Sequence, residues 1–422
     1  TEIKVIDPAT VNGSLVAVRK PLFNAASAQF PQCSGYYQDR LYYGFNNFLS
    51  GSKLGDFKSF DVGTGEDTDA LVISLKDNAD NSIINVHGGK QLEVYTKNSE
   101  YVCPQQTDQA LTPSTFSIKS QSSIGSNENC NIDGYMNDSY FVNRSGKSIY
   151  AFKFNGVGLA YSSFNISEQA SSLINSPSKI SAISVGTESK EELLLYCNND
   201  SLNCMQYQGS GSYAAFSSFE FEEDIEIKDI STIGDETFVL AYKGSYYFIL
   251  KFESFDANND ITMDFRVERT SDGSGIVASL DEYESTTVYV IRQSDNYFYG
   301  GFQVSGNQIN IDDFNADVYV GYLFDCEIEL LNYFYGEDSF NYPKKISKLY
   351  VDYYNSQNFS VNGTKVPQLS LNNGIEIIKT GVYEERPLLG WFKDSSLSIL
   401  QERSPYNLNI TKIQYEITAK NL

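Results

Sequence analysis

The chain of 422 residues is poor in the side chains on which most active sites depend. It has one histidine, His87, one tryptophan and three methionines. A Ser-His-Asp triad or a multi-histidine metal site would have to be built around that single imidazole. The six cysteines form no Cys-x-x-Cys pair, which argues against a zinc ribbon or a redox dithiol. We therefore expect no catalytic residue, metal or cofactor.

Long apolar runs and phosphate-binding loops are also missing. No run of about 18 apolar residues occurs, and the start at Thr1 shows no charged segment followed by an apolar one, so neither a membrane helix nor a signal peptide is expected. No glycine-rich loop ends in Lys-Ser or Lys-Thr. Residues 256–260 space their oxygen atoms like an EF-hand, but Ile261 and Val267 replace the required glycine and glutamate, which favours a polar turn.

The residues that are abundant favour β-structure and an acidic surface. Tyrosine (31) and phenylalanine (27) are frequent, and clusters of Asn, Gly, Asp and Ser separate the apolar runs. The 54 acidic and 31 basic residues give a formal charge of -23. A nucleic-acid grip based on phosphate neutralisation is not expected from such a surface. Acidity also keeps a large β-protein soluble, so charge alone does not identify the function.

Strand-turn-strand units recur along the first three quarters of the chain. Their turns are centred at intervals of roughly 45 to 57 residues, a period close to that of four-stranded propeller blades. We therefore predict an all-β, β-propeller-like assembly of antiparallel hairpin units with additional C-terminal strands. Stacked β-sandwiches remain the alternative, because alternation fixes strands but not how sheets close. The six turns lie at 38–39, 88–89, 144–146, 198–200, 243–245 and 293–295.

The rhythm changes after about residue 305. We predict hairpin repeats over residues 1–305 and a C-terminal β region over residues 306–422 that closes the fold or forms platform and tip contacts. Residues 164–180 are the best helix candidate, with Ser167 as N-cap. The Asn-rich stretch at 355–373 is expected to be a loop or long hairpin that makes contacts. Cys197 and Cys204 flank a predicted hairpin turn, which leaves open whether they form a disulfide or stay thiols.

A series of short motifs follows in a fixed order between residues 37 and 152. It begins with Asp-Arg-Leu-Tyr-Tyr-Gly at 39–44 and continues with Gly-Asp-Phe, an acidic turn, Leu-Thr-Pro and Gln-Ser-Ser-Ile-Gly. In order and spacing, the series resembles the tail nozzle proteins of short-tailed bacteriophages (podoviruses), also called tail tubular protein B. Closing strands around Pro405 also resemble that family. The residues that carry the resemblance are Asp39, Arg40, Gly44, Gly55, Asp56, Phe57, Asp67, Asp69, Leu111, Thr112, Pro113, Gln121, Gly125 and Pro405.

The resemblance implies a structural virion protein and not an enzyme. Six copies would form a tube below the portal and its adaptor (head-to-tail connector) proteins, retain the genome, and conduct the DNA during ejection without sequence-specific binding. Further partners would be tail fibre or tail tip proteins, and the host cell envelope at ejection. The protein would reside in the virion tail after assembly in the host bacterial cytoplasm.

Two other functions stay open. A receptor- or glycan-binding, sialidase-like β-propeller would use exposed aromatic residues and an acid pair in a central pocket. Residues 271–275 (Ser-Asp-Gly-Ser-Gly) faintly resemble the Asp-box of sialidases, but the tryptophan that ends that motif is absent. A capsid or tail decoration protein is the third option, and it would not plug a channel.

Overall fold

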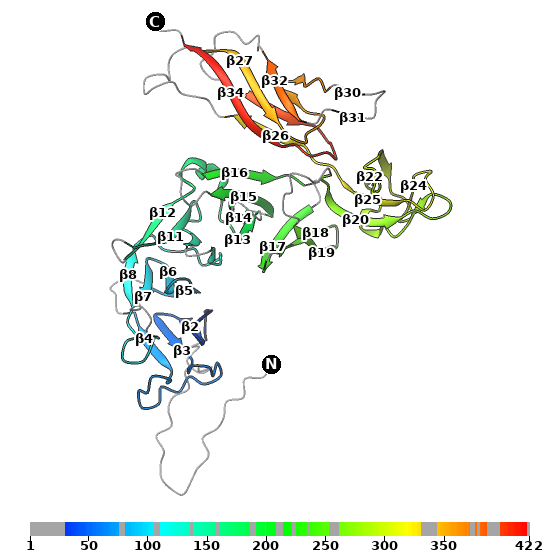
Figure 1. Cartoon of the computed structure of the whole chain (residues 1–422). Coiled ribbons are helices and arrows are strands. Elements are labelled where there is room, and N and C mark those ends of the chain that lie inside the picture. The colour runs from blue at the N-terminus through cyan, green and yellow to red at the C-terminus, as the bar shows by residue number, and fades with distance from the viewer. Residues whose placement is uncertain are drawn as a thin grey trace. The chain divides into compact units, whose positions relative to one another are not determined.

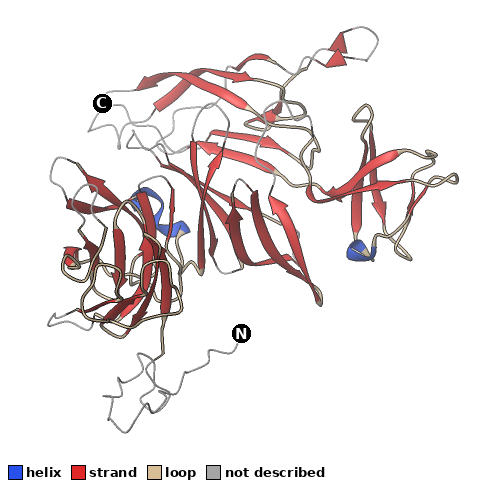
Figure 2. Cartoon of the chain, turned by 60° about the horizontal axis from the view of Figure 1, so that its bottom comes forward, coloured by secondary structure: helices blue, strands red, loops and turns tan. Residues whose placement is uncertain are grey.

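The structure is a computed structural model whose regular elements are almost all β-strands (Figures 1 and 2). Within the described residues, helix is confined to two short 3-10 segments, η2 Glu168–Leu173 and η3 Asp281–Tyr283. Among the described residues, no helix is long and apolar enough to cross a bilayer. The described residues are 30–75, 81–104, 110–135, 138–156, 160–185, 191–198, 200–207, 214–221, 225–234, 236–252, 261–330, 344–368, 370–371, 376–377, 380–385 and 397–419.

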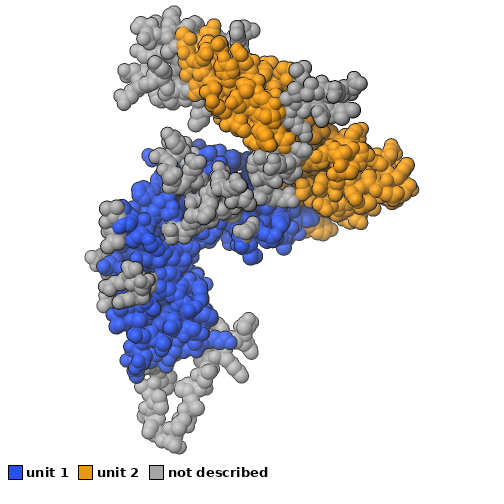
Figure 3. Space-filling view, in the orientation of Figure 1, with its two compact units in different colours: residues 1–219, 226–242, 247–252 blue, residues 220–225, 243–246, 253–422 orange. Residues whose placement is uncertain are grey.

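The chain divides into two compact units (Figure 3). The first comprises residues 1–219, 226–242 and 247–252, and the second comprises residues 220–225, 243–246 and 253–422. Each unit has its own sheets and its own apolar clusters.

The first unit is a succession of antiparallel sheets in which each strand pairs with the next along the chain. Four sheets have four strands, and a fifth has three described strands. The four are β1–β4 (Cys33–Tyr37, Arg40–Phe45, Phe48–Gly51, Leu71–Ser74), β5–β8 (Ile83–Gly88, Leu92–Thr96, Glu100–Cys103, Lys119–Ser122), β9–β12 (Asp133–Tyr135, Asp138–Val142, Ile149–Asn155, Ala160–Asn165) and β13–β16 (Lys179–Val185, Glu191–Asn198, Ser201–Tyr207, Ala214–Phe219). The fifth is β17–β19 (Ile225–Ile233, Glu236–Lys243, Tyr246–Phe252).

The first four sheets stack face to face, and each of the three junctions between them has an apolar cluster. Strand β10 shows why: Tyr140 and Val142 belong to the cluster shared with the fourth sheet, whereas Phe141, between them, belongs to the cluster shared with the second sheet. Alternate residues of a strand point to opposite faces, so both faces of this sheet are buried. Stacked four-stranded meanders are the arrangement of propeller blades, and the predicted all-β, propeller-like fold is confirmed.

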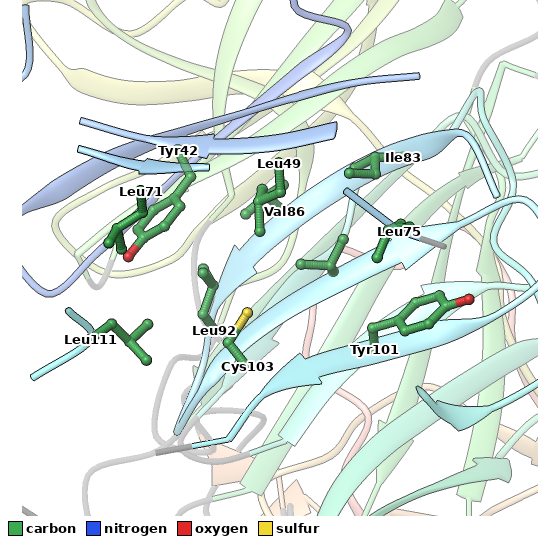
Figure 4. Packing of buried hydrophobic residues seen from close by; sticks show 11 residues of the cluster. Tyr42, Leu49, Leu71, Leu75, Ile83, Val86, Leu92, Tyr101, Cys103 and Leu111 are labelled. Carbon is green, nitrogen blue, oxygen red and sulfur yellow. The ribbon is translucent and has the colours of Figure 1, made fainter. Parts of the chain in front are cut away.

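The junction between the first and second sheets shows this packing at close range (Figure 4). Tyr42 and Leu49 from the first sheet lie against Val86 and Leu92 from the second, and all four are buried. Burial of an aliphatic or aromatic side chain contributes about 1.5–3 kcal/mol, so such a cluster is enough to fix one sheet on the next.

The six predicted turns join strands that pair with each other. In the first, Gln38 and Asp39 have φ values of 45° and 52°. Two successive positive φ angles are typical of the type I′ turn, whose twist matches that of the strands it connects. The local turn signals of the sequence therefore located the hairpins correctly.

The second unit is also all β, but many of its neighbouring strands are not consecutive in sequence. Its first sheet runs β20-β25-β22-β23, so β25 is inserted between strands that precede it in sequence. Two further sheets, β26-β33-β28-β29 and β32-β27-β34, share one buried cluster that includes Val351 and Ile399. The strands are β20 Asp264–Thr270, β21 Ile276–Val277, β22 Thr287–Arg292, β23 Phe298–Gln303, β24 Ile309–Asn310, β25 Asp317–Tyr322, β26 Cys326–Leu330, β27 Lys344–Tyr353, β28 Ser360–Val361, β29 Thr364–Lys365, β30 Ser370–Leu371, β31 Glu376–Ile377, β32 Gly381–Glu385, β33 Leu397–Gln401 and β34 Ile410–Ala419.

This topology corrects the boundary expected after residue 305. A cut there separates β20, β22 and β23 from β25, which is hydrogen-bonded to both β20 and β22. The boundary was misplaced because the hairpin at 293–295 resembles the earlier ones, although its sheet is assembled from strands distant in sequence.

Two further expectations are also corrected. Residues 164–180 contain only the short segment η2 between β12 and β13, and the Ser167 side chain makes no cap hydrogen bond. Its hydroxyl instead accepts a bond from the Ile149 backbone at 2.8 Å. The described part of the Asn-rich stretch is not a protruding contact loop, because Phe359 and Val361 are buried in the core of the second unit.

The cysteines are all free thiols. Cys197 lies opposite Leu202 and Cys204 opposite Leu195 in the hairpin register, so the two sulfur atoms are not partners across the strands. Burial raises the pKa of Cys197 to about 12 and that of Cys204 to about 11, which keeps both protonated.

We predict that Phe152→Ala lowers the free energy of unfolding by about 3–5 kcal/mol, because it leaves a cavity at the junction of the second and third sheets. Phe152 is buried between the rings of Tyr95 and Tyr161, with ring centroids 5.7 and 4.7 Å away. Urea denaturation measures the change. Phe164→Ala, on the same sheet but 53% exposed, is the matched control and should change stability by less than about 0.5 kcal/mol. Equal effects of the two substitutions would contradict the stacked arrangement.

Candidate functional site

The Arg40 side chain fastens the long connection between β3 and β4. It is 1% exposed, although arginine is almost never fully buried without partners. Nη1 donates to the carbonyl oxygens of Ser52 and Asp69 at 2.6 and 2.7 Å, and Nη2 donates to that of Asp67 at 2.8 Å. The planar fork of guanidinium donors suits this task, since it can hold several oxygens at once. Arg40 thus ties both ends of the connection to β2.

Asp69 organises the turn at the end of the same connection. Its Oδ2 accepts hydrogen bonds from three successive backbone N–H groups, those of residues 64, 65 and 66, each at 3.0 Å. Its Oδ1 lies 3.2 Å from the Lys53 ammonium. Burial by itself would raise the pKa of Asp69, but the Glu66 N–H and Lys53 hold it below its ordinary value. The carboxylate therefore stays charged and keeps the acidic turn closed.

The remaining motif residues of the first sheet shape its turns. Gly55 has a φ of 71° and donates its N–H to the Asp39 carbonyl at 2.9 Å. Asp56 Oδ1 accepts from the Lys58 N–H at 3.2 Å. Phe57 is exposed and packs edge-on against Tyr36, with ring centroids 5.5 Å apart. These contacts are local and structural.

Gly44 and Leu111 lie at the junction of the first and second sheets. A methyl group at Gly44 would lie 2.5 Å from Ile83 Cγ2 and 2.6 Å from Cys33 Sγ, so only glycine allows this approach. Leu111 is buried in the cluster of Figure 4. Thr112 and Pro113 follow it, and the Thr112 carbonyl closes a turn by accepting from the Phe116 N–H at 2.8 Å.

Gln121 and Gly125 lie at the next junction, between the second and third sheets. Gln121 Oε1 accepts from the Tyr161 N–H of the third sheet at 2.8 Å. The Gly125 N–H donates to Oε1 of the buried Glu100 at 2.8 Å, and the Ser122 hydroxyl donates to its Oε2 at 2.5 Å. Gly125 has a φ of 77°, and a side chain there would overlap the Lys97 carbonyl. The Gln-Ser-Ser-Ile-Gly motif therefore makes hydrogen bonds that help to hold the second and third sheets together.

Glu93 is a second buried acid at that junction. Its Oε2 accepts a hydrogen bond from the Tyr95 hydroxyl at 2.8 Å, whereas Oε1 has no hydrogen-bond partner among the described residues. Burial raises the pKa of Glu93 to about 7, and the hydroxyls of Ser139 and Tyr95 offset only part of that rise. Removing this carboxylate from water costs more than the hydroxyl contacts return, so burial shifts Glu93 toward its neutral form relative to a carboxyl group in water.

The single histidine does not form a catalytic cluster within the described part of the chain. Burial lowers the pKa of His87, and the nearby Asp133 counteracts that only in part. Asp133 is itself engaged, because its Oδ2 accepts from the Ala182 N–H at 2.9 Å. No group of three or more potential metal ligands occurs among the residues that the structure describes. Residues 256–260, whose oxygen spacing resembles an EF-hand, lie outside the described residues.

Two remaining sequence features lie in the second unit. The Pro405 carbonyl accepts from the Thr262 N–H at 2.8 Å, next to a bridge between Ile261 and Tyr406. In the segment that resembles an Asp-box, Asp272 Oδ1 accepts from the N–H groups of residues 274 and 276, which makes it a closed turn.

The structure thus brings the motif residues together in two ways. Asp39, Arg40, Gly55, Asp67 and Asp69 converge on the β3–β4 connection, whereas Gly44, Leu111, Gln121 and Gly125 lie at sheet junctions. Sequence reasoning missed Glu93 and Glu100. Each of these acids stands next to apolar residues in a strand that is buried at every position. An acid in such a strand needs a specific hydrogen-bond partner, and this pattern could have identified both.

Arg40→Met should lower the free energy of unfolding by about 3 kcal/mol, because the carbonyl oxygens of the buried Ser52 and Asp69 and that of the exposed Asp67 lose their donor. It should also speed tryptic cleavage after the exposed Lys58. Chemical denaturation and timed proteolysis measure the two effects. The control is Arg144→Met, which removes an exposed guanidinium and should leave both values nearly unchanged. Unaltered cleavage in Arg40→Met would show that Arg40 does not hold the connection.

Glu93→Gln should remove a pH dependence of stability. The pKa of Glu93 is raised from 4.5 to about 7 in the folded state, so the folded protein binds more protons between these values. The stabilisation that protonated Glu93 gives the folded state is fully present below pH 4.5 and is lost as the pH rises through 7. The variant should gain stability relative to the wild type over this range, by on the order of 3 kcal/mol. Urea denaturation at several pH values tests this, and a constant difference between the two proteins would refute it.

Comparison with known proteins gives no family. No family model matches the chain, and no curated protein matches it. Among solved structures, the dihydro-heme d1 dehydrogenase NirN matches with a TM-score of 0.34 and 8% identity, over 66% of this chain and 59% of that one. PorZ of the Porphyromonas gingivalis type-IX secretion system gives 0.34 and 10%, over 66% and 46%. The extracellular domain of BT4673 from B. thetaiotaomicron gives 0.27 and 10%, over 71% and 54%. The chain thus spans less than two thirds of these proteins.

Proposed function

We propose that this protein is a structural component of a short-tailed phage tail, namely the nozzle that retains the genome and conducts it during ejection. The proposal rests on the ordered motif series and on what those residues do in the fold. It includes a ring of six copies below the adaptor, as the resemblance implies.

The proposal depends most on the three hydrogen bonds that the Arg40 guanidinium donates to backbone carbonyl oxygens. It joins the Asp-Arg motif, the Gly-Asp-Phe turn and the acidic turn, which are separate in sequence, into one hydrogen-bonded unit. A structural protein needs connections of this kind to keep one conformation, and the Arg40 hydrogen bonds hold these three motifs in place. The Gly-Asp-Phe turn and the acidic turn each supply a hydrogen-bond partner to the earlier Asp-Arg motif, so the order of these three motifs follows from the fold.

The stacked sheets of the first unit suit a protein that serves as a wall. Each of the first three junctions between sheets is filled by apolar side chains, and buried polar groups add bonds across the second. A ring of identical copies requires two different complementary surfaces on each copy. The loops and edges of a row of sheets offer such surfaces at its two ends.

The charge is compatible with DNA passing through without sticking. Six copies at -23 each would carry 138 formal negative charges. Phosphates near such a surface are repelled, although salt screens the effect beyond about 8–10 Å. The electrostatics would therefore act on DNA only close to the wall.

Reconstitution tests the proposal directly. DNA-filled particles that carry portal and adaptor but lack the nozzle are mixed with the purified chain and sedimented. We expect about six copies per particle, by quantitative gel analysis, and slower leakage of the genome, by dye access to released DNA. Particles without the adaptor are the matched control and should bind none. Absence of binding, or equal binding to both particles, would reject the nozzle assignment.

A further inference from the structure

One face of the β20-β25-β22-β23 sheet has an unusual concentration of aromatic residues. In the register, Tyr289 lies opposite Gly301 and Gly321, and Ile291 lies opposite Phe298 and Tyr319. Residues opposite each other in a sheet point to the same side, so these side chains share one face. We call Tyr289, Phe298, Tyr319 and Arg266 the aromatic face. Ile291 is buried beneath it, whereas its four members are partly exposed.

Two of the three rings are partly exposed and are not the ring that Arg266 covers. Arg266 covers the ring of Tyr319, with its guanidinium carbon 4.5 Å from the centroid. Tyr289 and Phe298 are nearly parallel, with centroids 6.2 Å apart and planes at 22°. The Tyr289 ring leans over Gly301, where a methyl group would lie 3.2 Å from Cε1. Because Gly301 has no side chain, the ring can lie against the strand at that position, and Tyr289 stays partly exposed.

Polar groups border the rings. The Thr287 hydroxyl donates to Gln303 Oε1 at 3.1 Å. Neither the Gln303 amide nitrogen nor the Glu268 carboxylate has a hydrogen-bond partner among the described residues, and both side chains are exposed. Glu268 lies opposite Tyr319 and on the same face. Apolar ring surfaces with a few fixed polar groups are the usual composition of a small-ligand site.

We propose that the aromatic face binds an uncharged polysaccharide, with one sugar ring resting on Tyr289 and Phe298. The C–H groups on the flat side of a pyranose ring carry slight positive charge and contact the negative face of an aromatic ring favourably. Gln303 and Glu268 supply a donor and an acceptor for the sugar hydroxyls. This site lies on the sheet of the second unit and does not depend on the nozzle assignment.

Charge selects this ligand class over two others that stack on aromatic rings. Arg266 and Glu268 offset each other on the face itself, and the whole chain carries -23. Acidic polysaccharides and single-stranded nucleic acids are polyanions, which such a protein repels. A neutral glycan meets no such penalty.

Affinity electrophoresis of the full chain tests the proposal. Native gels contain dextran, yeast mannan, barley β-glucan or galactomannan, and parallel gels contain alginate. We expect at least one neutral polymer to retard the wild type, Tyr289→Leu to weaken this at least tenfold, and Tyr289→Phe, which keeps the ring, to retain it. Phe314→Ala is the matched control, because it removes a 61% exposed aromatic from the same unit outside this face.

Four results would overturn the proposal: no retardation by any neutral polymer, retardation by alginate alone, equal retardation of Tyr289→Leu and the wild type, or self-association that Tyr289→Leu abolishes. The last would assign the face to contact between copies. Thermal melting checks that each variant folds. If Tyr289→Leu does not fold, Phe298→Leu and Gln303→Ala provide the same comparison from the neighbouring strand.

Discussion

The first unit depends on one constraint: its second and third sheets have apolar side chains on both faces, so each of them must lie between two neighbours. Strand β6, Leu92–Thr96, is buried at every position, which alternation alone would not allow with one face in water. The face-to-face stack satisfies this requirement, and the close approach at Gly44 follows from it. A single sheet taken from the row would expose one or two apolar faces.

Burial on both faces also explains why the few charged groups at the junctions matter. Glu100 is matched by the hydroxyl of Ser122 and the N–H groups of residues 124 and 125, so its cost of burial is largely offset. Glu93, on the adjacent strand, has one such bond. At the second junction, Glu100 holds the backbone of residues 124 and 125 in place, whereas burial raises the pKa of Glu93. Both act at the contact between sheets, where both side chains are fully buried.

Aromatic residues have different roles at different places in the fold. In the sheet junctions Phe141 and Phe152 are fully buried, and they contribute through packing. On the β20-β25-β22-β23 sheet, Tyr289 and Phe298 remain partly exposed, and the Tyr289 ring lies against Gly301. Phe141 and Phe152 stabilise a sheet junction, whereas Tyr289 and Phe298 lie on a sheet face that solvent reaches.

The sequence by itself determined the features that arise within a few residues. Positive φ angles at Gln38 and Asp39 and the period-2 alternation specify hairpins, since backbone conformation and side-chain direction are local properties. What only the tertiary structure decided was partnership between distant segments. Arg40 bonds to a carbonyl 29 residues away, β25 enters the sheet between β20 and β22, and the Asn-rich stretch supplies Phe359 to a core. An alternating strand can pair with any other, so long-range packing selects its neighbour, and no local pattern records that choice.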